Sequence, residues 1–143
     1  MPAVKAALVA LLSANGALAG VQISQGYPGE SFIEREAIYT DRVTGRHEIA
    51  NIKAGRKQRD ENYALTLVVS VVSDAPEDVA DVETRAFVLL QEIEDTLADD
   101  PSLGNVDGVV HAVAGQFREL ADPTTNGAAC VIEFEVEVNA RLI

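Results

Sequence analysis

Three glutamates near the end of the chain are the strongest candidates for chemistry, because they recur at every second position. Glu133, Glu135 and Glu137 alternate with apolar residues, so in an extended strand they share one face and stand about 6.5–7 Å apart. Neighbouring carboxylates can bind a metal ion or exchange a proton, but no added histidine or second cluster accompanies these three. The pattern favours a solvated strand face, and the acidic lining of an aqueous channel is the alternative.

The other reactive side chains are isolated in the sequence. His47 lies in a polar segment, His111 on an apolar strand face and Cys130 at the start of the last strand. We expect a surface role for His47, a satisfied core role for His111 and a buried apolar role for Cys130. The sequence contains no nucleophile elbow, dinucleotide fingerprint, phosphate-binding loop or Cys-x-x-Cys pair. We therefore expect no enzyme and assign no catalytic residue, metal ligand or cofactor.

Composition narrows the range of functions further. The chain of 143 residues is 48% hydrophobic and has a formal net charge of -12, which disfavours general binding to nucleic acid or to an anionic membrane. No apolar run approaches the ~18–20 residues that a bilayer span requires. A single cysteine cannot form an internal disulfide, so the fold does not depend on an oxidising compartment. We expect one acidic domain over residues 1–143 that assembles in the cytosol.

The first segment imitates a secretory signal, because the apolar run 6–12 is followed by a small-residue motif. The run is at the minimum length for a signal, however. Residues 2–14 also have Pro2 near the start and apolar side chains, such as Val4 and Leu8, at helical spacing. We therefore predict a short packed helix over residues 2–14.

The centre of the chain changes its hydrophobic period. Residues 62–73 are rich in Leu and Val, which predicts a buried strand. From Glu77 the apolar spacing becomes helical, and Pro101 with Gly104 ends the element. The predicted buried face of this helix consists of Val79, Val82, Ala86, Leu89, Leu90, Ile93 and Leu97. This unit of strand and helix is expected to build the core.

The remaining segments complete an α+β fold. Short or mixed alternation predicts strands at 19–25, 33–43 and 105–118, and the turn pair Asn126-Gly127 lies in a loop before the last strand. That strand alternates almost without interruption from Cys130 onward. We predict a mixed, largely antiparallel sheet of four to five strands with two helices packed on one face.

Charge is segregated along the chain. A polar segment at about 41–62, interpreted as a long loop or hairpin, holds six of the 11 basic residues, whereas 74–100 holds ten acids and one arginine. A solvated loop explains this pattern, and docking between subunits explains it equally well. The residues assigned to subunit or partner docking are Arg56, Lys57, Arg59, Asp78, Asp81 and Glu92.

Three short motifs are set between a short N-terminal helix and an alternating last strand: Arg59-Asp60-Glu61-Asn62-Tyr63, Glu83-Thr84-Arg85-Ala86-Phe87 and Asp100-Pro101-Ser102-Leu103-Gly104. In this combination the chain resembles the tail terminator, or tail completion, proteins of long-tailed bacteriophages. The resemblance covers most of the chain, and residues 15–34 match least.

The resemblance implies a structural virion protein without enzymatic activity. It implies a homo-oligomer, a hexameric ring at the head-proximal end of the tail tube, which ends tube polymerisation and provides the head-joining surface. The implied partners are the tail tube protein and the head-tail connector protein, with assembly in the host cytoplasm and a final place in the virion tail.

In such a ring Glu133, Glu135 and Glu137 would line the lumen, and DNA would pass without specific binding because like charges repel. A head-side neck or connector protein is one alternative. A small enzyme or ligand-binding domain is the alternative from a different class.

Overall fold

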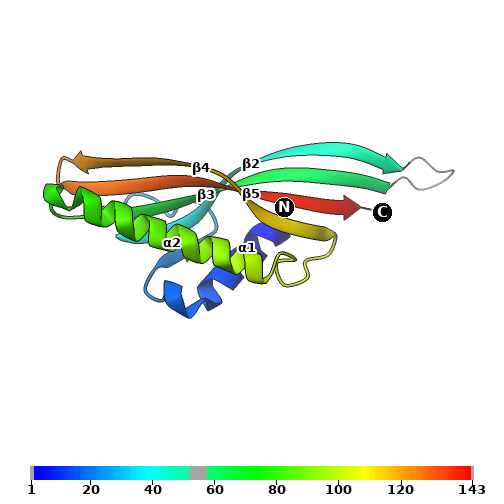
Figure 1. Ribbon diagram of the computed structural model, residues 1–143, viewed down its shortest axis with the longest axis horizontal. Coiled ribbons are helices and arrows are strands. Elements are labelled where there is room, and N and C mark those ends of the chain that lie inside the picture. Colours follow the sequence, from blue (N-terminus) through cyan, green and yellow to red (C-terminus); the bar gives the residue numbers. More distant parts are fainter. Residues whose placement is uncertain (1, 52–57, 143) are drawn as a thin grey trace.

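The computed structural model describes residues 2–51 and 58–142 and shows a five-stranded sheet with two helices on one side (Figure 1). The elements are α1 Pro2–Ala14, η1 Gly16–Leu18, β1 Gln22–Ser24, β2 Glu36–Asn51, β3 Gln58–Ser73, η2 Pro76–Asp78, α2 Val79–Asp99, β4 Val109–Thr124 and β5 Gly127–Leu142. The strand order is β1-β2-β3-β5-β4, parallel between β1 and β2 and antiparallel elsewhere. The predicted α+β fold class is confirmed. None of the helices among the described residues is long and apolar enough to cross a membrane.

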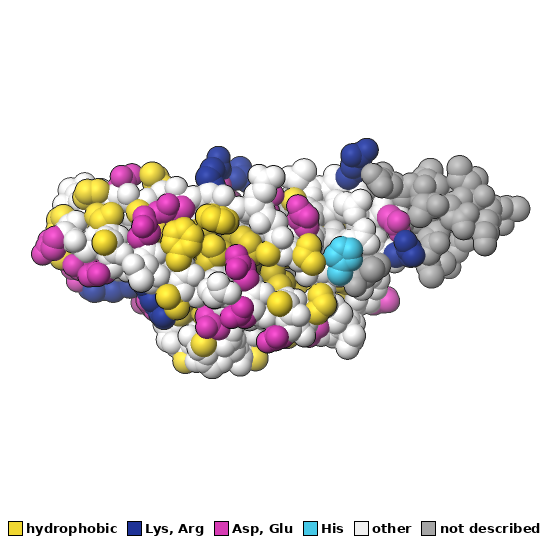
Figure 2. Space-filling view, viewed as in Figure 1, with side chains coloured by type: hydrophobic (Ala, Val, Ile, Leu, Met, Phe, Trp, Pro, Cys, Tyr) yellow, Lys and Arg dark blue, Asp and Glu magenta, His cyan; other side chains and the backbone are white. Residues whose placement is uncertain are grey.

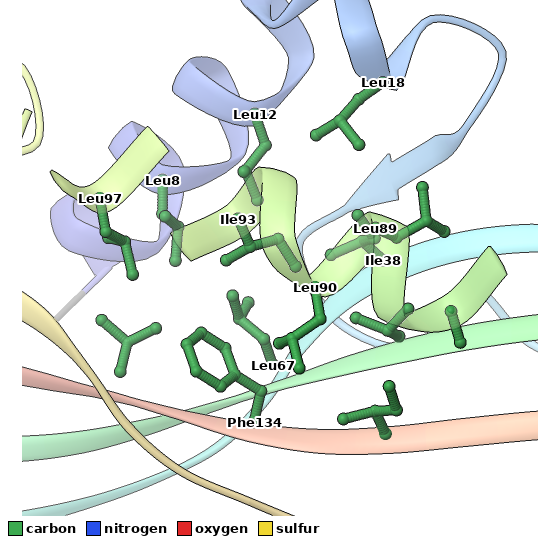
Figure 3. Close-up of a cluster of buried hydrophobic side chains, with 14 of the residues drawn as sticks. Leu8, Leu12, Leu18, Ile38, Leu67, Leu89, Leu90, Ile93, Leu97 and Phe134 are labelled. Atoms are coloured by element: carbon green, nitrogen blue, oxygen red, sulfur yellow. The ribbon is translucent and has the colours of Figure 1, made fainter. Parts of the chain in front are cut away.

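Helix α2 supplies the larger part of the helical layer. Six of the seven apolar residues predicted for its inner face are buried, and Val79 is partly buried. In Figure 3 the side chains of Leu90 and Ile93 point toward Leu67 of β3 and Phe134 of β5. Burial of each such side chain stabilises the fold by about 1.5–3 kcal/mol, so this contact anchors the helix on the centre of the sheet.

Helix α1 has the predicted bounds and packs beside α2. Val4, Leu8 and Leu12 are buried in the common core. The side chain of Asn15 then connects the two helices, because its Nδ2 donates to Glu92 at 3.3 Å and to the Thr96 hydroxyl at 3.2 Å. The end of α1 is therefore fixed against the last turns of α2.

The polar segment at 41–62 forms a hairpin in its described part. Strands β2 and β3 stay paired from the core out to Asn51 and Gln58, and they extend beyond the helical layer (Figure 1). The helices do not cover this arm, which fits its polar composition. Gly45 lies within β2 opposite Tyr63, whose ring occupies the space that a side chain would need.

Strand β4 is longer than predicted. It runs from Val109 to Thr124, so the expected loop before the last strand shrinks to a connection of two residues, with Thr124 paired to Gly127. Pro123 fits within this strand because β4 lies at the edge of the sheet, where a missing N–H is tolerated. Gly127 meets the end of β3 so closely that a Cβ there would lie 1.8 Å from the Ser73 carbonyl oxygen.

We expect Gly127→Ala to destabilise the protein by about 1–3 kcal/mol, because the added methyl group forces the β3 and β5 backbones apart. Gly16→Ala is the matched control, since a Cβ at Gly16 meets nothing within 4 Å. Urea denaturation of both variants measures the difference. Equal urea midpoints for the two variants would show that the contact between Gly127 and Ser73 does not limit the size of the side chain at residue 127.

Candidate functional site

The face of the sheet opposite the helices is the predicted candidate site. Strand β5 alternates as expected: its even-numbered residues from Cys130 to Ala140 are buried on the helix side. Glu133, Glu135 and Glu137 consequently lie together on the helix-free face. The three carboxylates nevertheless differ in their surroundings.

Glu133 is neutralised by two arginines. Arg118 of β4, its direct cross-strand partner, donates to Glu133, and Arg42 of β2 reaches the same oxygen at 3.3 Å. Hydrogen bonding with Arg118, supported by the charges of both arginines, holds the pKa of Glu133 below its usual range although partial burial opposes this shift. This triad connects three strands across the face of the sheet.

Glu135 and Glu137 belong to none of the ion pairs found between described residues. They pair across the sheet with Thr66 and Ala64 of β3, and Gly115 of β4 faces Glu137. A Cβ at Gly115 would lie 3.1 Å from the Glu137 side chain, so the small residue makes room for it. The described part of the chain contains no group of three His, Cys, Asp or Glu side chains suited to a metal ion.

Toward the hairpin the same face remains polar. Asn139 donates to the Asn62 side chain at 2.6 Å, and Arg141 holds Asp60 through contacts of 2.8 and 3.3 Å. Hydrogen bonding with Arg141 lowers the pKa of Asp60. Asn62, Asn139 and their neighbours line a hollow of about 400 Å³ that also includes His111.

The prediction that His111 belongs to the core is wrong, because this side chain is exposed. A register shift between Val109 and His111 changes the alternation, so Ala112 faces the core in its place. The prediction for Cys130 is confirmed: the thiol is fully buried, and burial is the main reason that its pKa rises to about 11. The side chain of His47 lies outside the described residues.

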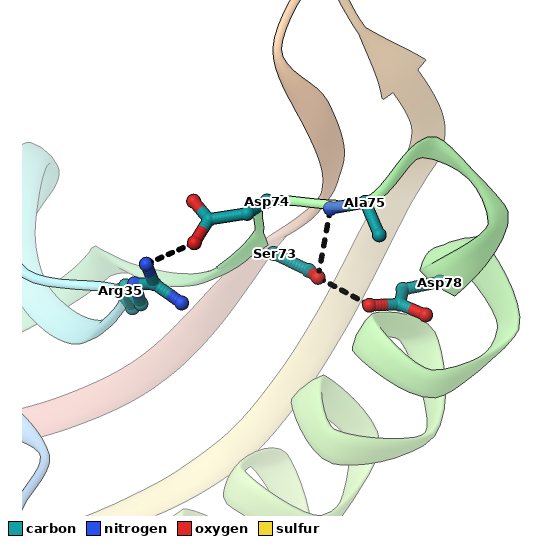
Figure 4. Close-up of polar contacts among 5 residues, drawn as sticks. All are labelled: Arg35, Ser73, Asp74, Ala75 and Asp78. Carbon is teal, nitrogen blue, oxygen red and sulfur yellow. Dashed lines mark hydrogen bonds and ion pairs between the residues drawn. The ribbon is translucent and has the colours of Figure 1, made fainter.

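The predicted docking residues are spread over several places. Asp78 accepts a hydrogen bond of 2.5 Å from the Ser73 hydroxyl, which also accepts from the Ala75 N–H at the entry to α2 (Figure 4). Asp81 is exposed one turn later. Glu92 lies about 16 Å further along the helix, given 1.5 Å per residue, where it binds Asn15.

Arg35 and Asp74 form an exposed ion pair beside the entry to α2 (Figure 4). On the basic side, Arg59 lies in β3, but its side chain is outside the described part, as are Arg56 and Lys57. Docking by the predicted basic and acidic residues therefore stays a prediction.

One surface was not expected from the sequence: an apolar area where β4 passes α2 (Figure 2). Phe117 of β4 and Phe87 of α2 meet edge to face, with ring centroids 5.8 Å apart, and both rings are exposed. Glu119 lies beside them, and hydrogen bonding with Glu83 raises the pKa of its carboxyl group. We call Phe87, Phe117, Glu83 and Glu119 the β4-edge surface.

The sequence signal for this surface was obscured by a second register shift, between Ala114 and Phe117. Simple alternation would place the odd-numbered residues Val113 and Phe117 on the same side of the strand. Because of the shift, their side chains lie on opposite sides of β4. The sequence did contain one signal for this surface: the segment that forms β4 has more apolar residues than one buried face needs.

The arginine contacts of Glu133 predict an acid-dependent contribution to stability. A folded-state pKa below the unfolded value stabilises the protein above the unfolded pKa, and this stabilisation is lost as the pH falls through the folded pKa. In the double variant Arg42→Gln/Arg118→Gln we expect the pKa of Glu133 to rise toward its ordinary range.

NMR titration of the Glu133 carboxyl group measures this change. Arg141→Gln is the control, because Arg141 binds Asp60 on the same face and does not contact Glu133. An unchanged Glu133 titration in the double variant would show that the arginines do not cause the shift.

Comparison with known proteins identifies the fold. No protein-family model and no curated protein matches this sequence. Among solved structures, the chain is similar to one from the "Virion of native gene transfer agent (GTA) particle", with a TM-score of 0.57 and 13% sequence identity. The match covers 96% of this chain and 94% of that chain. At this identity the likeness shows that the two chains share a fold over nearly their whole lengths.

Proposed function

We propose that this protein is a structural component of a phage-like virion and acts as a tail terminator. It forms a hexameric ring at the head-proximal end of the tail tube, ends tube polymerisation and provides the head-joining surface. The observation that carries the proposal is the fold shared over almost the whole chain with a chain of a gene transfer agent virion. The short motifs that resemble tail terminators support the more specific role.

The two unlike faces of the sheet support a ring around a channel. Helices cover one face, whereas the other has a continuous row of polar side chains from Asp60 and Arg141 to Glu133. With the helices outward, this polar face would surround the lumen. Glu135 and Glu137 would then supply the negative charge that keeps DNA from adhering, because Glu133 is already neutralised by arginines.

The expected result for the purified chain is a native mass that rises with concentration to a six-chain ring. In images of this ring, Glu135 and Glu137 should line the central opening. A ring with these carboxylates on its outer wall would remove the role in DNA passage. A chain that stays monomeric at every concentration would contradict self-assembly and favour a small enzyme or ligand-binding domain.

Partner binding separates the terminator from a head-side neck protein. We expect the chain to cap purified tail tubes and to stop the addition of further tube protein, because a terminator must recognise the growing end of the tube. Capsid portals without tails are the matched comparison. Binding to portals together with no effect on tube length would support the neck protein instead.

The basic residues Arg56, Lys57 and Arg59 are proposed to contact an acidic surface on a neighbouring subunit or on the tube protein. We expect Arg56→Glu/Lys57→Glu/Arg59→Glu to weaken ring formation, and more at low than at high salt, since ions screen the new repulsion. Sedimentation at several salt concentrations measures the effect.

The neutral triple variant Arg56→Gln/Lys57→Gln/Arg59→Gln is the control. It should weaken assembly less than the charge reversal, because it removes attraction without adding repulsion. Unchanged rings and unchanged tail joining in the reversed variant would mean that these residues are only a solvated part of the hairpin.

A further inference from the structure

Two edges of the sheet are open within the described residues. Strand β4 has β5 on one side and no described strand on the other. At the opposite edge, β1 covers β2 only at residues 37–39, so the longer part of β2 has an open side as well. Open edges with exposed apolar side chains invite pairing and are usually covered in the working assembly.

The β4-edge surface combines apolar and acidic character. Phe87 and Phe117 are 36% and 53% exposed although they contact each other. The arginines nearest in the sequence have other partners: Arg85 binds Glu36 at 2.7 and 3.1 Å, and Arg118 binds Glu133. The carboxylates of Glu83 and Glu119 therefore lie together without an ion pair to either arginine, next to an apolar area.

The opposite edge of the molecule has the complementary character. Helix α1 contains no acidic residue, and its outer face is formed by small exposed side chains: Ala3, Ala6, Ala10 and Ser13. A helix without a charged outer face is typical of one that is covered on both sides. One cation, Lys5, lies where α1 meets β2, and it donates to the Asp41 carbonyl oxygen at 3.2 Å.

We propose that the β4-edge surface of one copy docks onto the outer face of α1 and the adjoining β2 edge of the next copy. The proposal rests on the proposed ring function and names the surfaces that close the ring. The two surfaces lie at opposite edges of one sheet, so the contact is head to tail, the type that produces closed rings. Exposed aromatic side chains meet small apolar side chains, and the acid pair faces a helix that has one cation, Lys5, and no acidic residue.

Two variants test the contact, each altered on one surface only. The first is Phe87→Lys/Phe117→Lys, at side chains that are 36% and 53% exposed. The second is Ala6→Glu/Ala10→Glu, at exposed helix positions where glutamate is nearly as good a helix former as alanine. Thr125→Lys, in the exposed connection between β4 and β5, is the control. Circular dichroism and thermal melting establish that every variant folds.

We expect each surface variant alone to need a concentration about tenfold or more above that of the unaltered chain to assemble, whereas the control assembles normally. An equimolar mixture of the two variants should give a complex of two chains, because one intact pair of surfaces remains. Rings formed by either variant as readily as by the unaltered chain would overturn the contact and leave the ring function standing. Dimers of one variant alone would show a symmetric contact and also overturn it.

A cross-link provides a second measurement that does not depend on weakened assembly. With cysteines at Ala10→Cys and Phe117→Cys in one chain, oxidation should produce a ladder of covalent oligomers that ends at the ring. Cys130 does not compete, because its thiol is buried and its pKa is raised to about 11. Rings without cross-links would refute this contact, whereas an unaltered chain that never forms rings would refute the proposed function itself.

Discussion

The packing of α2 across β3 and β5 is the contact on which the rest of the structure depends. The helix places Leu90 and Ile93 over Leu67 and Phe134, and α1 joins the same core through Leu8 and Leu12. Because these apolar side chains all pack on one side of the sheet, polar residues occupy the other side. The separation into a helical face and a polar face is thus a direct result of where the core forms.

The parts of this fold that could be predicted from the sequence are those in which one period persists over many residues. The buried faces of α2 and β5 follow steps of 3.6 and of two residues, and the structure agrees with both. The arrangement of Glu133, Glu135 and Glu137 on one face followed from the same alternation. Their different charge states did not, because Arg42 and Arg118 reach Glu133 from strands that are distant in the sequence.

The misjudged parts are those in which the local pattern changes. Two register shifts in β4 move His111 outward and carry Phe117 to the helix side, and nothing in the residue types marks where such a shift falls. Gly45 lies inside β2, and the ring of Tyr63 across the hairpin explains why a glycine stands in a strand. In each case a contact between strands decided the outcome, and a single strand read alone does not contain that contact.

The triad of Arg42, Glu133 and Arg118 has a mechanical consequence. One carboxylate on β5 is held from β2 on one flank of the sheet and from β4 on the other. Backbone hydrogen bonds leave a sheet free to change its twist by several degrees between strands. Side-chain contacts that join three strands restrict this change of twist. Every copy would then present the same curvature to its neighbours, and uniform curvature is what allows identical subunits to close a circle.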